Sequence, residues 1–242
     1  MVSRFIKPFD QFFMARHLDQ GGRKPDQNQQ QDTVVLIHGL GGTRLDMWLM
    51  ARRLRGLGFN VRNWGYRSLG NRIETHAARL AEFLTKLSQE TNQKIHLATH
   101  SMGGIITRAM LADHAIERLG RIVMIAPPHQ GSHAARKLNR FIGWLSPSLL
   151  QLSDVESSFV NRLPNSFKQR DIEFAIIESI RDRVIVQGGV LLNGHHDYAQ
   201  IRAHHGVATF YDETITLVEN FLVNGEFSES ARPSRVSMDV GS

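Results

Sequence analysis

The sequence predicts an α/β fold with a mostly parallel central sheet, helices on both of its faces and a small inserted cap. Short apolar, β-branched runs alternate with segments of helical periodicity between residues 33 and 223, which is typical of a parallel sheet covered on both faces. One stretch of short, mixed apolar pieces interrupts this alternation. With 242 residues and 41% hydrophobic content, the chain is long enough to bury a sizeable core in a single domain.

The expected strands follow one another along the chain at residues 33–37, 59–64, 94–99, 121–125, 172–179 and 198–203. The helices expected between and after them lie at 46–57, 73–87, 105–114 and 212–223. Gly58 provides a stop for the first of these helices. Residues 132–170, which contain Trp144, Pro147 and Pro164, do not continue the alternation, so we expect them to form the inserted cap.

The two ends of the chain differ from the domain expected at 33–226. Residues 1–20 place five apolar side chains on one helical stripe with basic residues beside them: Phe5, Ile6, Phe9, Phe12 and Phe13. We favour a helix packed on the domain surface, and the alternative is a peripheral helix that contacts membrane lipid or covers an acyl-binding cleft. A polar linker completes the N-terminal region at 1–32, and residues 227–242 are expected to be disordered.

Composition narrows the classes of partner and the compartment. The net charge is +6, but the arginines are scattered, which argues against a nucleic-acid-binding protein and leaves attraction to an anionic membrane surface open. No run reaches the ~18 to 20 apolar residues of a transmembrane helix, and no signal peptide is apparent. We therefore expect a cytoplasmic protein, peripheral to a membrane if residues 1–20 bind lipid.

The residue types that hold metals in proteins do not form a recognisable motif. The chain has no cysteine, which excludes disulfides and thiolate chemistry. It has 12 histidines, but they do not form H-E-x-x-H or a comparable set on one element. We therefore expect neither a metal nor another cofactor.

The most specific motif is the segment Thr99-His100-Ser101-Met102-Gly103-Gly104, which lies between an expected strand and an expected helix. A serine on such a turn exposes its Oγ above the sheet, where the first N–H groups of the helix also point. Small neighbours are needed because the backbone is strained there. Gly103 and Gly104 are small, whereas Thr99 replaces the first glycine of the usual G-x-S-x-G pattern. The simpler interpretation is a serine that caps a helix at a glycine-rich turn.

A second glycine-rich turn, at residues 39–42, directly follows the first expected strand in the segment V-V-L-I-H-G-L-G-G-T. Acyl transfer passes through a tetrahedral oxyanion that needs preorganised N–H donors. Glycines allow the backbone of such a turn to approach a substrate closely. Its place after a strand and ahead of Ser101 makes this turn a candidate oxyanion loop.

These two segments, together with the segment Pro127-Pro128-His129-Gln130-Gly131-Ser132, resemble the α/β-hydrolase superfamily, and more narrowly its short bacterial lipases and esterases. The resemblance covers roughly residues 33–132 and 172–223. It implies an α/β-hydrolase fold, a nucleophile at Ser101 and an oxyanion hole made by the backbone N–H groups of Leu40 and Met102. It also implies that an acid and then a histidine follow Ser101 along the chain.

Three acidic residues lie near the fifth expected strand. Glu173 lies at the start of that strand and Glu178 lies inside it, whereas Asp182 follows its end. The turn at Asp182 resembles the D-x-V turn that carries the acid in the family. We therefore predict Asp182 as the triad acid, and the alternative is an ordinary surface aspartate between two arginines.

Four histidines follow Asp182 in the sequence. His195 and His196 precede the last expected strand, so we interpret them as loop residues. His204 and His205 lie between that strand and the final helix, where the triad histidine belongs. The resemblance favours His205 over His204, because a glycine follows it as in related lipases.

The predicted catalytic set is thus Ser101, Asp182 and His205. It predicts a serine hydrolase that cleaves a carboxylic ester, of a small molecule or a lipid, through an acyl-enzyme and without a cofactor. One alternative is an acyltransferase or thioesterase with the same triad. The other is a catalytically silent α/β-hydrolase fold used for binding. The sequence specifies neither the acyl chain, nor the alcohol, nor the oligomeric state.

Overall fold

The computed structural model describes residues 31–164, 172–185, 188–192 and 196–227. The helix predicted within residues 1–20, nearly all of the linker and all but the first residue of the tail predicted at 227–242 lie outside these ranges. They stay predictions. Among the described helices, none combines the length and the apolar character that a membrane span requires.

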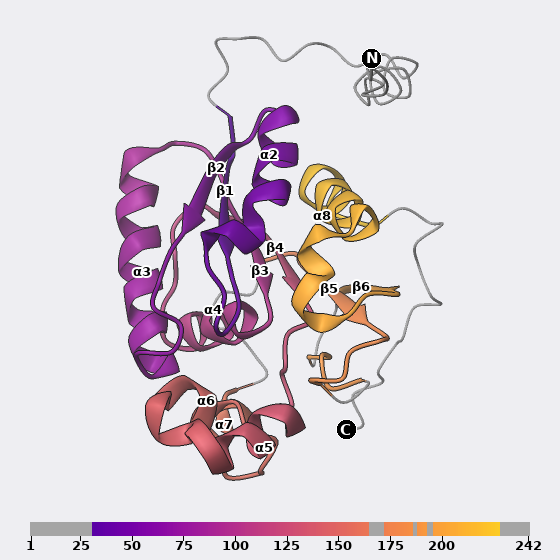
Figure 1. The fold of residues 1–242 in the computed structure, drawn as a ribbon. Helices are drawn as coiled ribbons and strands as arrows, with labels where there is room; N and C mark the ends of the chain where they lie inside the picture. Colours follow the sequence, from indigo (N-terminus) through magenta and orange to yellow (C-terminus); the bar gives the residue numbers. More distant parts are fainter. Residues whose placement is uncertain (1–30, 165–171, 186–187, 193–195, 228–242) are drawn as a thin grey trace, which may run out of the picture. The chain divides into compact units, whose positions relative to one another are not determined.

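The core of the structure is a six-stranded sheet in the order β2-β1-β3-β4-β5-β6, in which every neighbouring pair is parallel (Figure 1). The strands are β1 (Thr33–Ile37), β2 (Asn60–Trp64), β3 (Ile95–His100), β4 (Leu119–Ile125), β5 (Phe174–Ser179) and β6 (Asp197–Ile201). This arrangement confirms the predicted parallel sheet. Parallel strands present their carboxyl ends at one edge, where open α/β sheets bind their ligands.

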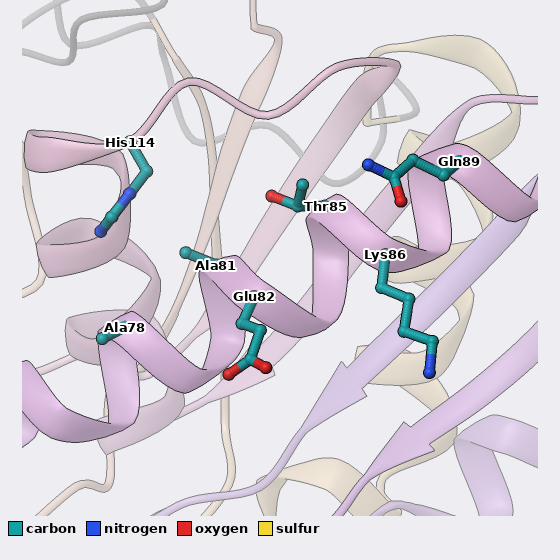
Figure 2. Close-up of a pocket in the computed structure, with 7 residues that line it drawn as sticks. All are labelled: Ala78, Ala81, Glu82, Thr85, Lys86, Gln89 and His114. Carbon is teal, nitrogen blue, oxygen red and sulfur yellow. The ribbon is translucent and has the colours of Figure 1, made fainter.

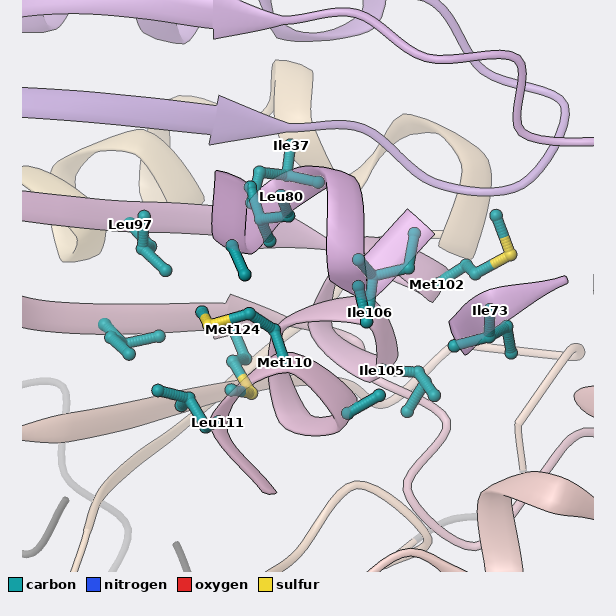
Figure 3. Packing of buried hydrophobic residues seen from close by; sticks show 14 of the residues in the cluster. Ile37, Ile73, Leu80, Leu97, Met102, Ile105, Ile106, Met110, Leu111 and Met124 are labelled. Atoms are coloured by element: carbon teal, nitrogen blue, oxygen red, sulfur yellow. The ribbon is translucent and has the colours of Figure 1, made fainter. Parts of the chain in front are cut away.

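Helices cover both faces of the sheet, and side chains that alternate along each strand contact them. On one face, Val35, Ile37 and Leu97 pack with apolar residues of α3 (Ile73–Glu90) and α4 (Met102–Asp113), as Figure 3 shows for part of the cluster. On the other face, Leu36 and Val123 join a cluster that includes α2 (Trp48–Gly56) and α8 (Asp212–Asn224). The strands therefore need apolar residues at successive positions.

Two predicted helices differ in detail from the structure. The segment expected at 46–57 begins as a 3₁₀ turn, η1 (Arg44–Met47), capped by the side chain of Thr43, and then continues as α2. Helix α4 begins at Met102 rather than at residue 105, because Gly103 and Gly104 belong to its first turn. A further 3₁₀ helix, η3 (His205–Phe210), fills the loop expected between β6 and α8.

The segment between β4 and β5 forms a separate group of short helices at the end of the sheet (Figure 1). They are α5 (His133–Ile142), η2 (Gly143–Leu145), α6 (Pro147–Gln151) and α7 (Phe159–Arg162). Helix α6 is fixed to the start of α3, because the amide of Gln151 accepts from Ile73 N–H (2.6 Å) and donates to Glu74 Oε2 (2.6 Å). These helices correspond to the predicted cap.

The buried side chain of Arg108 fixes the far end of this cap to α4. Its guanidinium donates to the backbone carbonyls of His129 (3.0 Å), Leu163 (2.6 Å) and Pro164 (3.1 Å). One side chain therefore joins α4 to the loop after β4 and to the segment that leaves α7. An arginine suits this place because its planar group carries five donors in a fixed fork.

Candidate active site

Ser101 lies in a strained turn between β3 and α4. Its backbone angles are φ 52° and ψ −122°, a region that residues other than glycine rarely adopt. Two backbone bonds hold the turn, from Ser101 N–H to Ile125 O and from Gly104 N–H to Ser101 O, both at 2.9 Å. The hydroxyl is thus fixed at the carboxyl edge of the sheet, in front of the first N–H groups of α4.

The residues packed against this turn must be small. A β-carbon on Gly39 would lie 3.0 Å from that of Ser101, and one on Gly103 would lie 2.6 Å from the carbonyl oxygen of Ile37. A β-carbon on Gly104 would lie 2.9 Å from that of Pro127, and at an ordinary contact distance of 3.4 Å from the hydroxyl oxygen of Thr99, which replaces the usual glycine. The packing of Pro127 therefore requires a glycine at position 104, and Thr99 does not.

The structure brings Ser101, His205 and Asp182 into one hydrogen-bonded chain. His205 Nδ1 lies 2.5 Å from Asp182 Oδ2, and His205 Nε2 lies 2.8 Å from Ser101 Oγ. A carboxylate only accepts hydrogen bonds, so Nδ1 carries the proton and Nε2 is left to accept from the serine hydroxyl. His204, the alternative, is exposed at the start of η3 and makes neither contact.

Asp182 is held in a turn directly after β5. Its Oδ1 accepts from the N–H groups of Val184 (2.7 Å) and Ile185 (3.2 Å), which leaves Oδ2 for His205. Burial acts to raise the pKa of Asp182, but the hydrogen bond and charge attraction of His205, with the two N–H groups, outweigh it and lower that pKa. The carboxyl group is therefore ionised at neutral pH.

The two other acidic candidates have different partners. Glu173 is largely exposed and pairs with Arg121 at 2.6 Å. Glu178 is buried and accepts from Tyr198 Oη, Gln200 Nε2 and the N–H of Gly188. Neither of them contacts a histidine that also reaches Ser101. Of the three acidic residues, Asp182 is the one that joins the chain.

His100 supports the histidine loop from below the turn. Its ring is buried, and its Nε2–H donates to the backbone carbonyl of His205 at 3.0 Å. Burial, helped by repulsion from His205, lowers the pKa of His100 to about 3, so the ring stays neutral. The residue before Ser101 thus fixes the backbone of His205, whose ring contacts Ser101.

The loop at residues 39–42 lies against Ser101 and is held from outside by the segment after β2. Tyr66 Oη donates to the carbonyl of His38 at 2.7 Å, and the N–H of Gly41 donates to Ser68 Oγ at 2.9 Å. These bonds flank Leu40 on both sides. Within the described ranges, the backbone N–H groups of Leu40 and Met102 have no hydrogen-bond acceptor, so both remain available to a ligand.

Sequence reasoning missed Tyr66 and Ser68. Strand β2 pairs with β1 in parallel, so the loops that follow the two strands meet at the same edge of the sheet. A tyrosine and a serine shortly after the second expected strand were the available signal. The sequence alone does not specify that these two strands pair, so it does not show that Tyr66 and Ser68 lie beside the turn at residues 39–42.

Other buried histidines lie near this edge without joining the chain. His76 and His129 are buried, and neither ring has a hydrogen-bond partner among the described residues. Burial lowers the pKa of His76 to about 4 and that of His129 well below its usual value. Over the residues that the structure describes, no three histidine, aspartate or glutamate side chains are grouped so as to hold a metal ion.

An open hollow also lies on the outer surface along α3, beside the end of α4 (Figure 2). Its lining residues are Ala78, Ala81, Glu82, Thr85, Lys86, Gln89 and His114. Ser101, Asp182 and His205 do not contribute to this hollow, which is therefore distinct from the candidate active site.

Comparison with solved structures gives several similar folds at low sequence identity. Mature lipase BlEst2 of Bacillus licheniformis is 16% identical with a TM-score of 0.64, over 84% of this chain and 94% of that one. Lipase B of Aspergillus fumigatus is 15% identical with a TM-score of 0.66, over 87% and 56%. An esterase of Pyrococcus furiosus is 18% identical with a TM-score of 0.61, over 81% and 83%. These likenesses establish the fold.

Comparison of the sequence itself identifies the family. No curated protein sequence matches the chain. The family model of the alpha/beta hydrolase fold matches residues 32–166, which is more than half of the chain and includes both glycine-rich turns and most of the cap. The protein therefore belongs to the α/β-hydrolase fold family.

Proposed function

We propose that the protein is a serine hydrolase that cleaves carboxylic esters through an acyl-enzyme on Ser101. One observation carries the proposal: a single imidazole, that of His205, contacts the serine hydroxyl at 2.8 Å and a buried carboxylate at 2.5 Å. A nucleophile, a base and a group that orients the base form the arrangement that activates serine in acyl transfer. A helix cap alone would require neither the histidine nor the aspartate.

In the proposed reaction, Ser101 Oγ attacks the ester carbonyl carbon while its proton passes to His205 Nε2. The tetrahedral intermediate collapses when the bond to the leaving alkoxide breaks, and His205 returns the proton to that alkoxide. A water molecule then attacks the acyl-enzyme while its proton passes to the same histidine. The bond from the acyl carbon to Ser101 Oγ breaks, His205 returns the proton to Oγ, and the free acid is released. Asp182 stays ionised and stabilises the imidazolium in both halves of the reaction.

The oxyanion that forms at the carbonyl oxygen needs donors that are already in place. We assign this role to the backbone N–H groups of Leu40 and Met102. The absence of other acceptors for them among the described residues and the close packing of Gly39 on Ser101 support the assignment. The hydrogen bonds from Tyr66 and to Ser68 would hold the loop in position before substrate arrives.

The direct test is turnover of short p-nitrophenyl esters by Ser101→Ala. We expect kcat to fall by about 10⁴-fold or more, because the nucleophile is lost, with an unchanged circular dichroism spectrum. A fluorophosphonate probe should label the wild type on Ser101 and should not label this variant. Turnover at the wild-type rate by Ser101→Ala, or no labelling of the wild type, would contradict the proposal, and the second result would favour a catalytically silent protein.

The acceptor of the acyl group requires a separate measurement, because the same triad serves hydrolases and acyltransferases. Product analysis with a competing alcohol reports how the acyl-enzyme partitions. We expect the free acid as the main product in water. An ester of the added alcohol as the main product would indicate an acyltransferase, and faster turnover of a matched thioester than of the ester would indicate a thioesterase.

A further inference from the structure

The cap carries an exposed surface that the active site does not use. Phe141 and Trp144 are 75% and 79% exposed, Leu138 and Leu150 are about half exposed, and all four belong to α5, η2 and α6. Leu138 and Phe141 lie three residues apart on α5, so they share one face of the helix. We refer to these four side chains, with the basic residues Arg136, Lys137 and Arg140, as the cap patch.

The charge of the cap patch has one sign. Arg136, Lys137 and Arg140 are exposed on α5, and residues 133–151 contain no aspartate or glutamate. Arg136 pairs with Asp154 at 3.1 Å, which leaves Lys137 and Arg140 as the main source of positive potential. An exposed aromatic face beside basic residues is the pattern of helices that lie in the interface of an anionic membrane.

The charge of the cap patch also argues against two other partners for this surface, residues 1–20 of the same chain and a second copy of the chain. The stripe of phenylalanines in residues 1–20 lies among Arg4, Lys7 and Arg16, so it would bring positive charge against positive charge. A second copy related by a two-fold axis would do the same, since such an interface joins a surface to itself. The cores of protein interfaces are also depleted in lysine, whereas the headgroups of anionic phospholipids complement Lys137 and Arg140.

We propose that the cap patch binds the surface of an anionic phospholipid bilayer, with Phe141 and Trp144 inserted among the headgroups. The cap lies at the same end of the sheet as the loops that follow β3 and β5 (Figure 1). Docking therefore brings the edge that carries Ser101 and Asp182 towards the lipid. The inference does not depend on the chemistry at Ser101, and it concerns a different segment from residues 1–20.

The test is co-sedimentation of the full chain with vesicles of phosphatidylcholine and of equal parts phosphatidylcholine and phosphatidylglycerol. We expect Phe141→Ser/Trp144→Ser to lower the partition coefficient on the mixed vesicles by at least about tenfold, because the inserted apolar surface is lost. Each basic residue near an anionic surface raises the partition coefficient by about fivefold. The variant Lys137→Gln/Arg140→Gln, which lacks two of them, should therefore have a partition coefficient about 25-fold lower on mixed vesicles and little changed on phosphatidylcholine alone.

Two control variants remove exposed apolar side chains or exposed positive charges from positions outside the cap. Leu57→Ser/Val223→Ser removes two side chains that are about half exposed, outside the cap, and Arg52→Gln/Lys86→Gln removes two exposed charges. The apolar control should bind like the wild type. The charge control, which removes the same net charge away from the cap, should lose far less than 25-fold. Melting temperatures verify that each variant is folded.

A second measurement reads insertion directly. Brominated phosphatidylcholine mixed with phosphatidylglycerol should quench the tryptophan fluorescence of the wild type, and Trp144→Phe should remove most of that quenching. The proposal is overturned if the wild type does not bind mixed vesicles, or if both cap-patch double variants bind as the wild type does, which would place binding in another segment such as residues 1–20. It is also overturned if these variants change the oligomeric state and leave vesicle binding intact.

Discussion

Three contacts fix the imidazole of His205. Asp182 accepts from Nδ1 at 2.5 Å, the Ser101 hydroxyl lies 2.8 Å from Nε2, and the neutral ring of His100 donates to the backbone carbonyl of His205 at 3.0 Å. The first contact selects the tautomer and the third fixes the backbone from which the ring extends. A base held in this way needs no rearrangement before it accepts a proton.

The proposed choice of His205 over His204 as the base gives a first prediction. We expect His205→Ala to lower kcat on a p-nitrophenyl ester by about 10⁴-fold or more, because the serine loses its base. His204→Ala should change kcat by less than about threefold, because that side chain is exposed and contacts neither Ser101 nor Asp182. Steady-state kinetics of the two variants decide the matter, and the reverse order of effects would exclude His205 as the base.

The hydrogen bonds that hold the turn at residues 39–42 give a second prediction. Tyr66→Phe removes the hydroxyl that donates to His38 O at 2.7 Å, so the loop that presents Leu40 N–H becomes less well held. We expect kcat to fall by about fivefold with a smaller change in KM, because a hydrogen bond is worth about 1 kcal/mol and the donor acts mainly in the transition state. Tyr198→Phe, whose hydroxyl bonds to Glu178, is the control. Equal effects of both variants on kcat would contradict the assigned role.

Site residues that directly follow a strand could be predicted from the sequence. Site residues that depend on contacts between distant segments could not. Ser101 and Asp182 each follow an apolar strand directly, so position alone suggested where they would lie. His204 and His205 have the same local context, and only the backbone path into η3 turns one ring towards Ser101. Tyr66 and Ser68 act on a loop 27 or 28 residues away, which depends on the pairing of β1 with β2.

Helix α4 packs closely against the end of β1 at Gly103. A β-carbon on Gly103 would lie 2.6 Å from Ile37 O and 2.9 Å from His38 O, so the helix would have to move away from the end of β1. We expect Gly103→Ala to lower the free energy of unfolding by about 2 kcal/mol and to reduce kcat as well. Urea denaturation and ester hydrolysis measure the two effects.

Gly56 is the matched control for this prediction. It also lies in a helix, α2, but a β-carbon there would meet no atom within 4 Å. Gly56→Ala should therefore leave activity unchanged and leave stability unchanged or raise it by up to about 1 kcal/mol. If Gly103→Ala were as harmless as Gly56→Ala, the proposed close approach would be wrong.

The bounds of helices and strands were predicted most accurately where the hydrophobic pattern of the segment was strongest. The strand expected at 33–37 has the bounds of β1, because an uninterrupted buried run has few alternative conformations. The start of α4 was predicted three residues late, because glycines disfavour helices intrinsically and only tertiary packing requires them at 103 and 104. Individual cap helices were not predicted, since pieces as short as α6 and α7 carry less than two turns of periodicity.

At the scale of the whole molecule, buried histidines make stability depend on pH. Burial lowers the pKa of His76 from 6.5 to about 4. Below pH 6.5 the unfolded chain therefore binds a proton that the folded chain refuses until about pH 4, so stability falls as the pH falls through this range. His100, with a pKa near 3, acts in the same direction.

The lowered pKa of His76 predicts how the stability of His76→Phe depends on pH. His76→Phe keeps a ring beside Tyr66, which His76 contacts edge-on, but it cannot be protonated. Its loss of stability between pH 7 and pH 5 should be smaller than that of the wild type by about 2 kcal/mol. Urea denaturation at the two pH values measures the difference, and an equal loss in both proteins would show that His76 titrates normally.

The parallel sheet explains why residues from distant parts of the chain meet at one place. The glycine-rich turn at residues 39–42 follows β1, Ser101 follows β3, Asp182 follows β5 and His205 follows β6. Because all these strands run in one direction, their carboxyl ends share one edge. We propose that this edge forms an acyl-transfer site on Ser101, with the backbone N–H groups of Leu40 and Met102 as its oxyanion hole.

A crystal structure of the protein after reaction with an alkyl phosphonate tests the proposed acyl-transfer site. We predict a covalent bond from phosphorus to Ser101 Oγ, with the phosphoryl oxygen about 2.7–3.1 Å from the backbone nitrogens of Leu40 and Met102 and the His205 ring still bonded to Asp182. A phosphonate attached to another residue, or one whose oxygen points away from both nitrogens, would contradict the proposed site.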